Sequence, residues 1–117
     1  MRIIGMFGFA LAIGLVVGPR GACAHAILLE SRPASGDSVA AGPGHVVLRF
    51  NSRVDRARSR LELRGAGKPV AVLTLMPSGP DTLEADVSLV PGAWTLRWQV
   101  LAVDGHITRG DVPVLVK

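Results

Sequence analysis

Three histidines are the side chains of this 117-residue sequence best suited to bind a metal ion: His25, His45 and His106. The single cysteine, Cys23, precedes all three. The chain from His25 onward therefore has no thiolate for Cu(I), Zn²⁺ or an iron–sulfur cluster. Nitrogen and oxygen donors in a square arrangement instead favour Cu²⁺.

His25 directly follows Ala22-Cys23-Ala24, a small-residue sequence typical of signal-peptidase cleavage sites. Cleavage after Ala24 would give His25 a free α-amine beside its imidazole. The amine and the ring Nδ1 could then chelate one ion in a six-membered ring. Because a free α-amine has a pKa of about 8, copper can displace its proton at neutral pH. In the uncleaved chain this nitrogen is an amide, and the chelate cannot form.

Asp104-Gly105-His106 supplies the second candidate pair of ligands. Residues two apart in an extended or tightly turned segment project to the same side, and glycine lets the backbone fold closely between them. The alternative is an aspartate that closes a turn beside a surface histidine. His45 follows Gly42-Pro43-Gly44, where a surface role is expected and a secondary metal contact is the alternative.

The first 24 residues have the layout of a signal peptide. Met1 and Arg2 form a positive start, Ile3–Val17 is an uncharged apolar run, and Gly18-Pro19 ends it. A transmembrane anchor is one alternative, but a bilayer span needs roughly 20 apolar residues. Lipidation of Cys23 is another, although Arg20 occupies a position where a lipoprotein signal has an aliphatic residue. We therefore predict a signal peptide over 1–24 and one exported domain over 25–117.

The predicted domain is only weakly basic. Arg2 and Arg20 leave with the signal peptide, so eleven Lys and Arg face nine Asp and Glu. No basic patch with interleaved aromatic residues is present, which argues against a nucleic-acid-binding protein. The local cluster of arginines between Arg53 and Arg64 is expected on a solvated loop and strand edge.

Short alternations of apolar and polar residues, separated by Gly, Pro, Ser and Asp, predict seven strands. They lie near Ala26–Ser31, His45–Asn51, Arg60–Arg64, Val70–Met76, Thr82–Ser88, Ala93–Val100 and Asp111–Val116. Their number and spacing predict an all-β fold, an antiparallel β-sandwich with Greek-key connections. Trp94 and Trp98 are predicted to fill its core, and substrate stacking is the alternative for them.

Three segments resemble the CopC family of periplasmic copper-resistance proteins. His25–Gly36 is similar to the family's opening, an N-terminal His and a short strand followed by Ser-x-Pro-Ala-x-Gly. Val47–Asn51 is similar to its L-x-F-S/N strand. Gly92–Gly110, with its Asp104-Gly105-His106 sequence, is similar to its G-x-Y/W-x-V-x-W…D-G-H-x-x-x-G signature, and this closing motif is the most discriminating.

The resemblance implies a seven-stranded, immunoglobulin-like sandwich, cupredoxin-like in outline, that binds Cu²⁺ in the periplasm. It also implies that His25, Asp104 and His106 hold the copper ion. A CopD-type inner-membrane copper transporter is the implied partner, and the processed protein is not expected to be embedded in the membrane.

Two positions depart from the family pattern. Ser52 stands where many relatives carry a glutamate near the copper, which puts the affinity of the site in question. Met76 is the only methionine after the predicted signal peptide, so we expect no separate Cu(I) site and place Met76 at an edge or in the core.

Three functions are compatible with these residues. The leading prediction is a copper carrier or buffer for copper resistance and homeostasis, with no turnover and thus no enzyme activity. A copper-dependent oxidative enzyme could use the same N-terminal histidine, but aromatic residues make up only 4% of the chain and offer no substrate platform. A metal-free interaction sandwich is the third.

Overall fold

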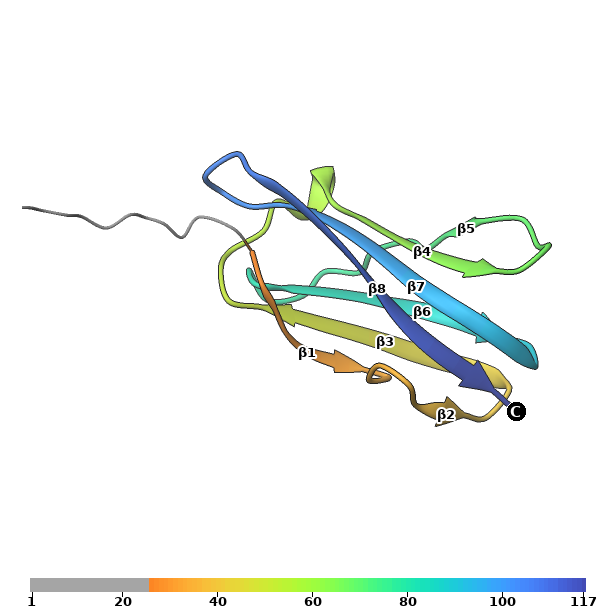
Figure 1. Cartoon of the computed structure of the whole chain (residues 1–117). Coiled ribbons are helices and arrows are strands. Elements are labelled where there is room, and N and C mark those ends of the chain that lie inside the picture. The colour runs from red at the N-terminus through yellow and green to blue at the C-terminus, as the bar shows by residue number, and fades with distance from the viewer. Residues whose placement is uncertain (1–25) are drawn as a thin grey trace, which may run out of the picture.

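The computed structural model describes residues 26–117, which form two packed β-sheets (Figure 1). The predicted signal peptide, residues 1–24, and His25 lie outside the described residues. Among those described, no helix is long and apolar enough to cross a membrane.

The described chain contains eight strands and one 3₁₀ turn. In chain order they are β1 (Leu28–Arg32), β2 (Ser38–Val39), β3 (Gly42–Phe50), η1 (Arg56–Arg58), β4 (Arg60–Gly65), β5 (Ala71–Val72), β6 (Thr82–Leu89), β7 (Gly92–Leu101) and β8 (Ile107–Val116). The all-β prediction is therefore confirmed.

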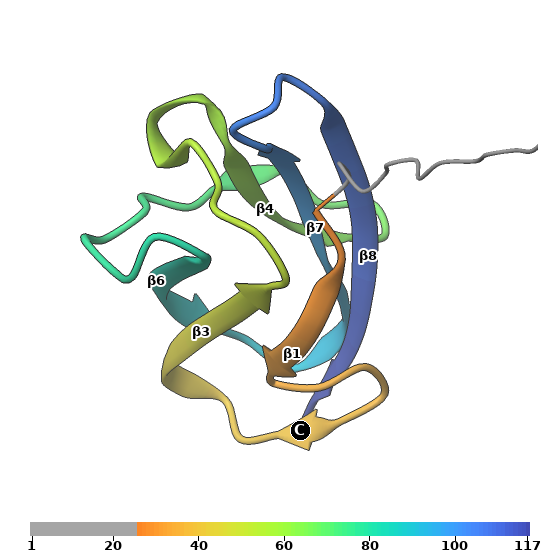
Figure 2. The ribbon, with the colours of Figure 1, turned by 90° about the vertical axis from the view of Figure 1, so that its left-hand side faces the viewer.

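The strands form a three-stranded sheet in the order β1-β3-β6 and a five-stranded sheet in the order β2-β8-β7-β4-β5. Figure 2 looks onto one end of the sandwich and shows the two layers facing each other. Strands β3 and β6 are neighbours, as are β4 and β7, although neither pair is consecutive in the chain. The chain therefore crosses between the sheets, as Greek-key connections require.

Three differences from the predicted strands are larger than the others. The short strand β2 lies in a predicted loop and pairs in parallel with β8, so the sandwich has eight strands and is not wholly antiparallel. Two residues are too few to show a periodicity. Strand β5 covers only Ala71–Val72. Strand β8 begins at Ile107 rather than Asp111, because its backbone pairs with β7 as far as Leu101.

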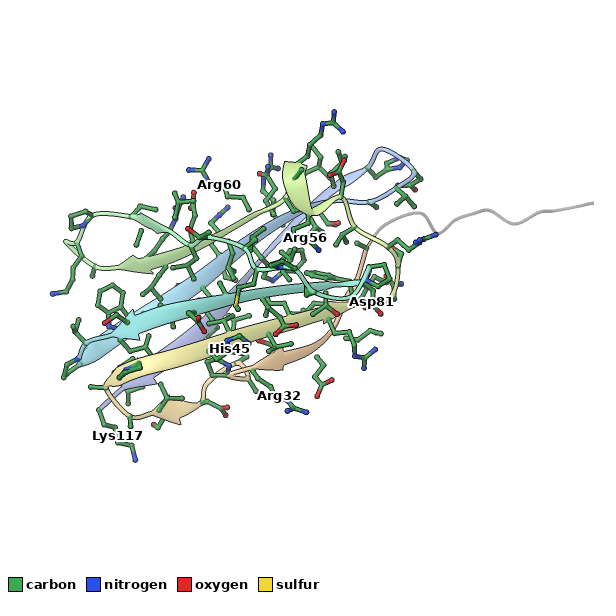
Figure 3. The ribbon with its side chains drawn as sticks, turned by 180° about the vertical axis from the view of Figure 1, so that it is seen from behind. Arg32, His45, Arg56, Arg60, Asp81 and Lys117 are labelled. Atoms are coloured by element: carbon green, nitrogen blue, oxygen red, sulfur yellow. The ribbon has the colours of Figure 1, made fainter. Side chains whose placement is uncertain are left out.

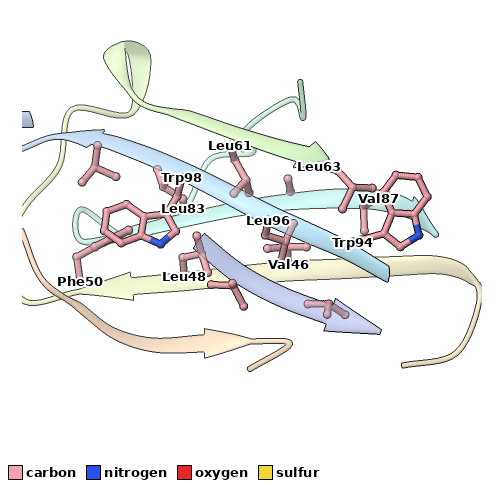
Figure 4. Close-up of a cluster of buried hydrophobic side chains, with 14 of the residues drawn as sticks. Val46, Leu48, Phe50, Leu61, Leu63, Leu83, Val87, Trp94, Leu96 and Trp98 are labelled. Carbon is pink, nitrogen blue, oxygen red and sulfur yellow. The ribbon is translucent and has the colours of Figure 1, made fainter. Parts of the chain in front are cut away.

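The core lies between the sheets, where the buried apolar residues of β3, β4, β6, β7 and β8 meet (Figure 4). The alternations predicted in β3 and β7 are confirmed, since most apolar residues are buried while most intervening positions are more exposed. In β4, Leu61 and Leu63 are buried as predicted, but Glu62 between them is buried as well. Trp94 and Trp98 are 9% and 6% exposed, which confirms both as core residues. The Trp98 and Phe50 rings meet edge to face with centroids 5.1 Å apart, which joins the two sheets.

The absence of a side chain at Gly110 leaves room for the indole ring of Trp98. The two residues are opposite each other on β8 and β7, and a Cβ atom at position 110 would overlap the indole ring. The last glycine of the D-G-H-x-x-x-G pattern is therefore required by core packing, four residues from His106. The Asp104-Gly105-His106 sequence and the tryptophan core thus share one hairpin.

We predict that Gly110→Ala destabilises the fold by about 1–3 kcal/mol, because the new methyl group forces Trp98 away from Phe50. Chemical denaturation followed by tryptophan fluorescence would measure this change. Gly79→Ala is the matched control, since a Cβ there meets only ordinary contacts beyond 3.5 Å, the nearest at 3.6 Å. Equal stability of Gly110→Ala and the unmodified protein would contradict the packing argument.

Candidate metal centre

Asp104 and His106 lie in the tight connection between β7 and β8. The Ala102 N–H donates to the His106 carbonyl at 2.9 Å, and the Gly105 N–H donates to the Ala102 carbonyl at 2.9 Å. Gly105 has a φ of +94°, a left-handed conformation that other residues adopt at a cost. This turn places Asp104 and His106 side by side at the end of the sandwich.

The Asp104 carboxylate makes two contacts with His106. Its Oδ1 accepts from the His106 backbone N–H at 3.1 Å, and its Oδ2 lies 3.1 Å from the ring Nδ1. The backbone hydrogen bond is the main reason that the pKa of Asp104 lies below its ordinary value, and the imidazole contact adds to the effect. The carboxylate is therefore ionised at neutral pH and can act as a ligand.

The spacing of these two groups suits adjacent ligands of one ion. Two donors that each lie about 2.0 Å from a metal at roughly a right angle are about 3 Å apart. Residues 26–117 contain no group of three or more histidine, cysteine or acidic side chains placed to hold a metal. Within the described chain, Asp104 and His106 therefore offer two neighbouring donor atoms.

The start of β1 and the β7–β8 turn occupy the same end of the molecule (Figures 1 and 2). Residues 51–54 connect them. The Asn51 side chain accepts from the Ile27 N–H at 2.7 Å, and the Asn51 N–H donates to the Ile27 carbonyl at 3.0 Å. Two residues later, the Arg53 carbonyl accepts from the Val103 N–H at 3.3 Å.

Neighbouring contacts fix both sides of this connection. Ala26, which directly follows His25 in the chain, is only 1% exposed and belongs to the core. On the other side, Val54 forms an isolated antiparallel bridge with Ala102. His25 itself lies outside the described residues, so its predicted role as a ligand stays a prediction.

Two residues of the connecting segment have roles that strand periodicity did not reveal. Asn51 clamps the start of β1 through both its side chain and its backbone. Ser52 has a buried hydroxyl with no hydrogen-bond partner among the described residues. The resemblance marked Ser52 as the position of a family glutamate, and the structure places it between the clamp on β1 and the contact to Val103.

His45 lies elsewhere, on the outer face of the three-stranded sheet (Figure 3). Its Nδ1 is 2.8 Å from Asp86 Oδ1 and its Nε2 is 2.8 Å from Glu84 Oε1, both on β6. Because each ring nitrogen faces a different carboxylate, the imidazole joins two strands and its two nitrogens point apart. These contacts, the one to Asp86 first, raise the pKa of His45 above its ordinary value.

Two other acidic residues near the candidate ligands in sequence are engaged by arginines. Glu30 pairs with Arg32 at 3.1 Å and with Arg49 at 3.3 Å. Asp111 lies 3.5 Å from Arg97. Neither contact involves Asp104 or His106.

Comparison with known proteins identifies relatives of the whole described domain. The family model described as the CopC domain matches residues 28–117. Protein YobA of Escherichia coli (strain K12) is 32% identical over 99 residues, which cover 80% of each protein. The crystal structure of CopC from Methylosinus trichosporium OB3b has a TM-score of 0.69 and 28% identity, covering 80% of this chain and 94% of that one.

PcoC, a methionine-rich copper-resistance protein from Escherichia coli, shares the fold. It has a TM-score of 0.63 and 20% identity over 80% of this chain and 100% of that one.

The paired carboxylates around His45 predict a pH-dependent contribution to stability. Only the protonated ring donates from both nitrogens, so the contacts stabilise the folded state below the ordinary histidine pKa, about 6.5. This stabilisation is lost as the pH rises through the higher pKa of the folded state. We expect His45→Gln to lower the melting temperature more at about pH 5.5 than at about pH 8.5. An equal decrease in melting temperature at both pH values would contradict a stabilising role for the protonated His45 ring.

Proposed function

The chain belongs to the CopC family, and from this we propose that it is an exported periplasmic protein that binds Cu²⁺ and carries or buffers it. In this role the protein binds copper and catalyses no reaction. Its predicted signal peptide would direct export, and cleavage after Ala24 would make His25 the first residue of the working protein.

In this proposal the copper ion is held by four donors from three residues. The α-amine and imidazole of His25 form the chelate, while Asp104 and His106 provide a carboxylate oxygen and a ring nitrogen. One observation carries the proposal: the Asp104–His106 pair lies at the end of the sandwich where β1 begins. The clamp between Asn51 and Ile27 supports it, because it limits how far the preceding residues can be from the turn.

The donor set favours the oxidised ion. Nitrogen and carboxylate oxygen donors suit Cu²⁺, whereas Cu(I) prefers sulfur ligands. PcoC is described as methionine-rich. In this chain Met76 is the only methionine from residue 25 onward. Reduction would therefore weaken binding and favour transfer to a partner, for which a CopD-type inner-membrane transporter is the candidate.

Acidification should also release the ion. The α-amine and both imidazoles must lose a proton to become ligands, so protons compete with copper as the pH falls. The low pKa of Asp104 means that its carboxylate is the last of the donors to be protonated. Copper release on acidification is thus expected to follow the protonation of the nitrogen donors.

We predict that Asp104→Asn and His106→Gln each weaken Cu²⁺ binding by at least about tenfold, because each removes a ligand. The His106 side chain is 55% exposed, so His106→Gln should leave the melting temperature of the metal-free protein almost unchanged. Isothermal titration with Cu²⁺ and thermal denaturation would measure both effects.

His45→Gln is the matched control, since His45 lies on the outer face of the other sheet. It should bind copper like the unmodified protein. Unchanged affinity in Asp104→Asn and His106→Gln, or an equal loss in His45→Gln, would contradict the proposed ligands.

A further inference from the structure

The outer face of the five-stranded sheet carries a group of four arginines, Arg60, Arg64, Arg97 and Arg109, which we call the arginine face. They point outward because their strand neighbours Leu61, Leu63, Leu96, Trp98 and Val112 point into the core. The strand register places them in rows. Arg60 is opposite Gln99, which is opposite Arg109, and in the next row Glu62 is opposite Arg97, which is opposite Asp111.

Glu62 fixes two of these arginines. It is the only buried charged residue among those described, at 7% exposure. Its Oε2 lies 2.6 Å from Arg60 Nε and its Oε1 lies 2.8 Å from Arg64 Nη2, and the Arg64 Nε–H donates to Oε1 at 2.9 Å. These contacts use one N–H group of Arg60 and two of Arg64, whereas a guanidinium has five. The arginines are thus held in place and retain donors for an anion.

The other two arginines are held in a similar way. Arg97 lies 3.5 Å from Asp111, and the Arg109 Nε–H donates to the Gln99 side-chain oxygen at 2.7 Å. All four line one surface groove of about 480 Å³, together with Glu62, Trp98 and Gln99. A groove lined by preorganised guanidinium groups suits planar anionic groups such as carboxylates.

The arginine face also carries the whole excess charge of the described chain. Residues 26–117 contain eleven Lys and Arg and nine Asp and Glu. Four of the cations and only two of the acids, Glu62 and Asp111, lie on this face. Seven of each sign remain elsewhere, so the rest of the domain is neutral overall. The positive potential is therefore concentrated on the outer face of the five-stranded sheet.

We propose that the arginine face is a docking surface for an acidic segment of a partner protein. Outward side chains recur about every 6.6–6.8 Å along a strand, which is also the spacing of alternate residues in an extended peptide. An extended segment that runs parallel to the strands, with carboxylates on alternate residues, can therefore meet the successive rows of the arginine face in turn. Charge complementarity of this kind sets the orientation of the bound segment and increases the rate at which the two proteins associate.

A partner protein fits this face better than an anionic membrane does. The Asp111 side chain is 50% exposed in the second row and would repel an unbroken layer of phosphates. A protein segment can place its carboxylates over the arginines and a neutral or basic residue over Asp111. The proposal is independent of the copper site, because no residue of the arginine face is a proposed ligand.

A labelled peptide of about twelve alternating Glu and Ser residues is the probe, with binding followed by fluorescence anisotropy at low and physiological salt. The unmodified protein should bind it, and the double variant Arg97→Gln/Arg109→Gln should bind at least about tenfold more weakly. These two arginines are chosen because Arg60 and Arg64 neutralise the buried Glu62. Circular dichroism would show whether the double variant is folded. A second double variant, Arg97→Lys/Arg109→Lys, keeps the positive charges and should bind the peptide more tightly than the Gln variant.

Arg53→Gln/Lys117→Gln is the matched control, because it makes the same change in net charge at exposed positions outside the arginine face. It should keep its affinity for the peptide. Absence of peptide binding by the unmodified protein, or an equal loss in both double variants, would overturn the proposal. Binding to phosphatidylglycerol vesicles but not to the peptide would overturn it in favour of a membrane.

Discussion

The hydrogen bonds of residues 51–54 are the constraint on which the proposed metal centre depends. On one side Asn51 holds Ile27 through its side chain and its backbone, and on the other the Arg53 carbonyl accepts from the Val103 N–H. Because these residues follow directly on β3, the core strand that ends at Phe50, the connection is anchored in the core. The sandwich thus brings together two parts of the chain more than 70 positions apart in sequence.

Packing and chemistry share the β7–β8 hairpin. Its inner side carries Trp98 over Gly110, while its tip carries the carboxylate and imidazole of Asp104 and His106. A rigid ladder of backbone pairs up to Leu101 and Ile107 leaves a short turn, so the two side chains have little freedom to separate. Such a turn would preorganise the two proposed ligands before an ion arrives, which would lower the entropic cost of binding.

Much of the fold could be predicted because β3 and β7 alternate regularly between core and solvent. The pair Asp104 and His106 was also predictable, since residues two apart around a glycine converge locally. By contrast, β2 is too short for a periodicity, and the early start of β8 depends on its partner strand. The bridge made by His45 could not be predicted either, because Glu84 and Asp86 lie about 40 residues further along the chain.

The most direct test of the account is a Cu²⁺ titration of two forms of the protein, one that begins at His25 and one with a single glycine ahead of it. Mass analysis of the exported protein would first establish that its natural first residue is His25. The account predicts at least about a tenfold loss of affinity in the extended form, because its α-amine is displaced from the imidazole, with an unchanged melting temperature without metal. Equal copper affinity in the two forms would contradict it.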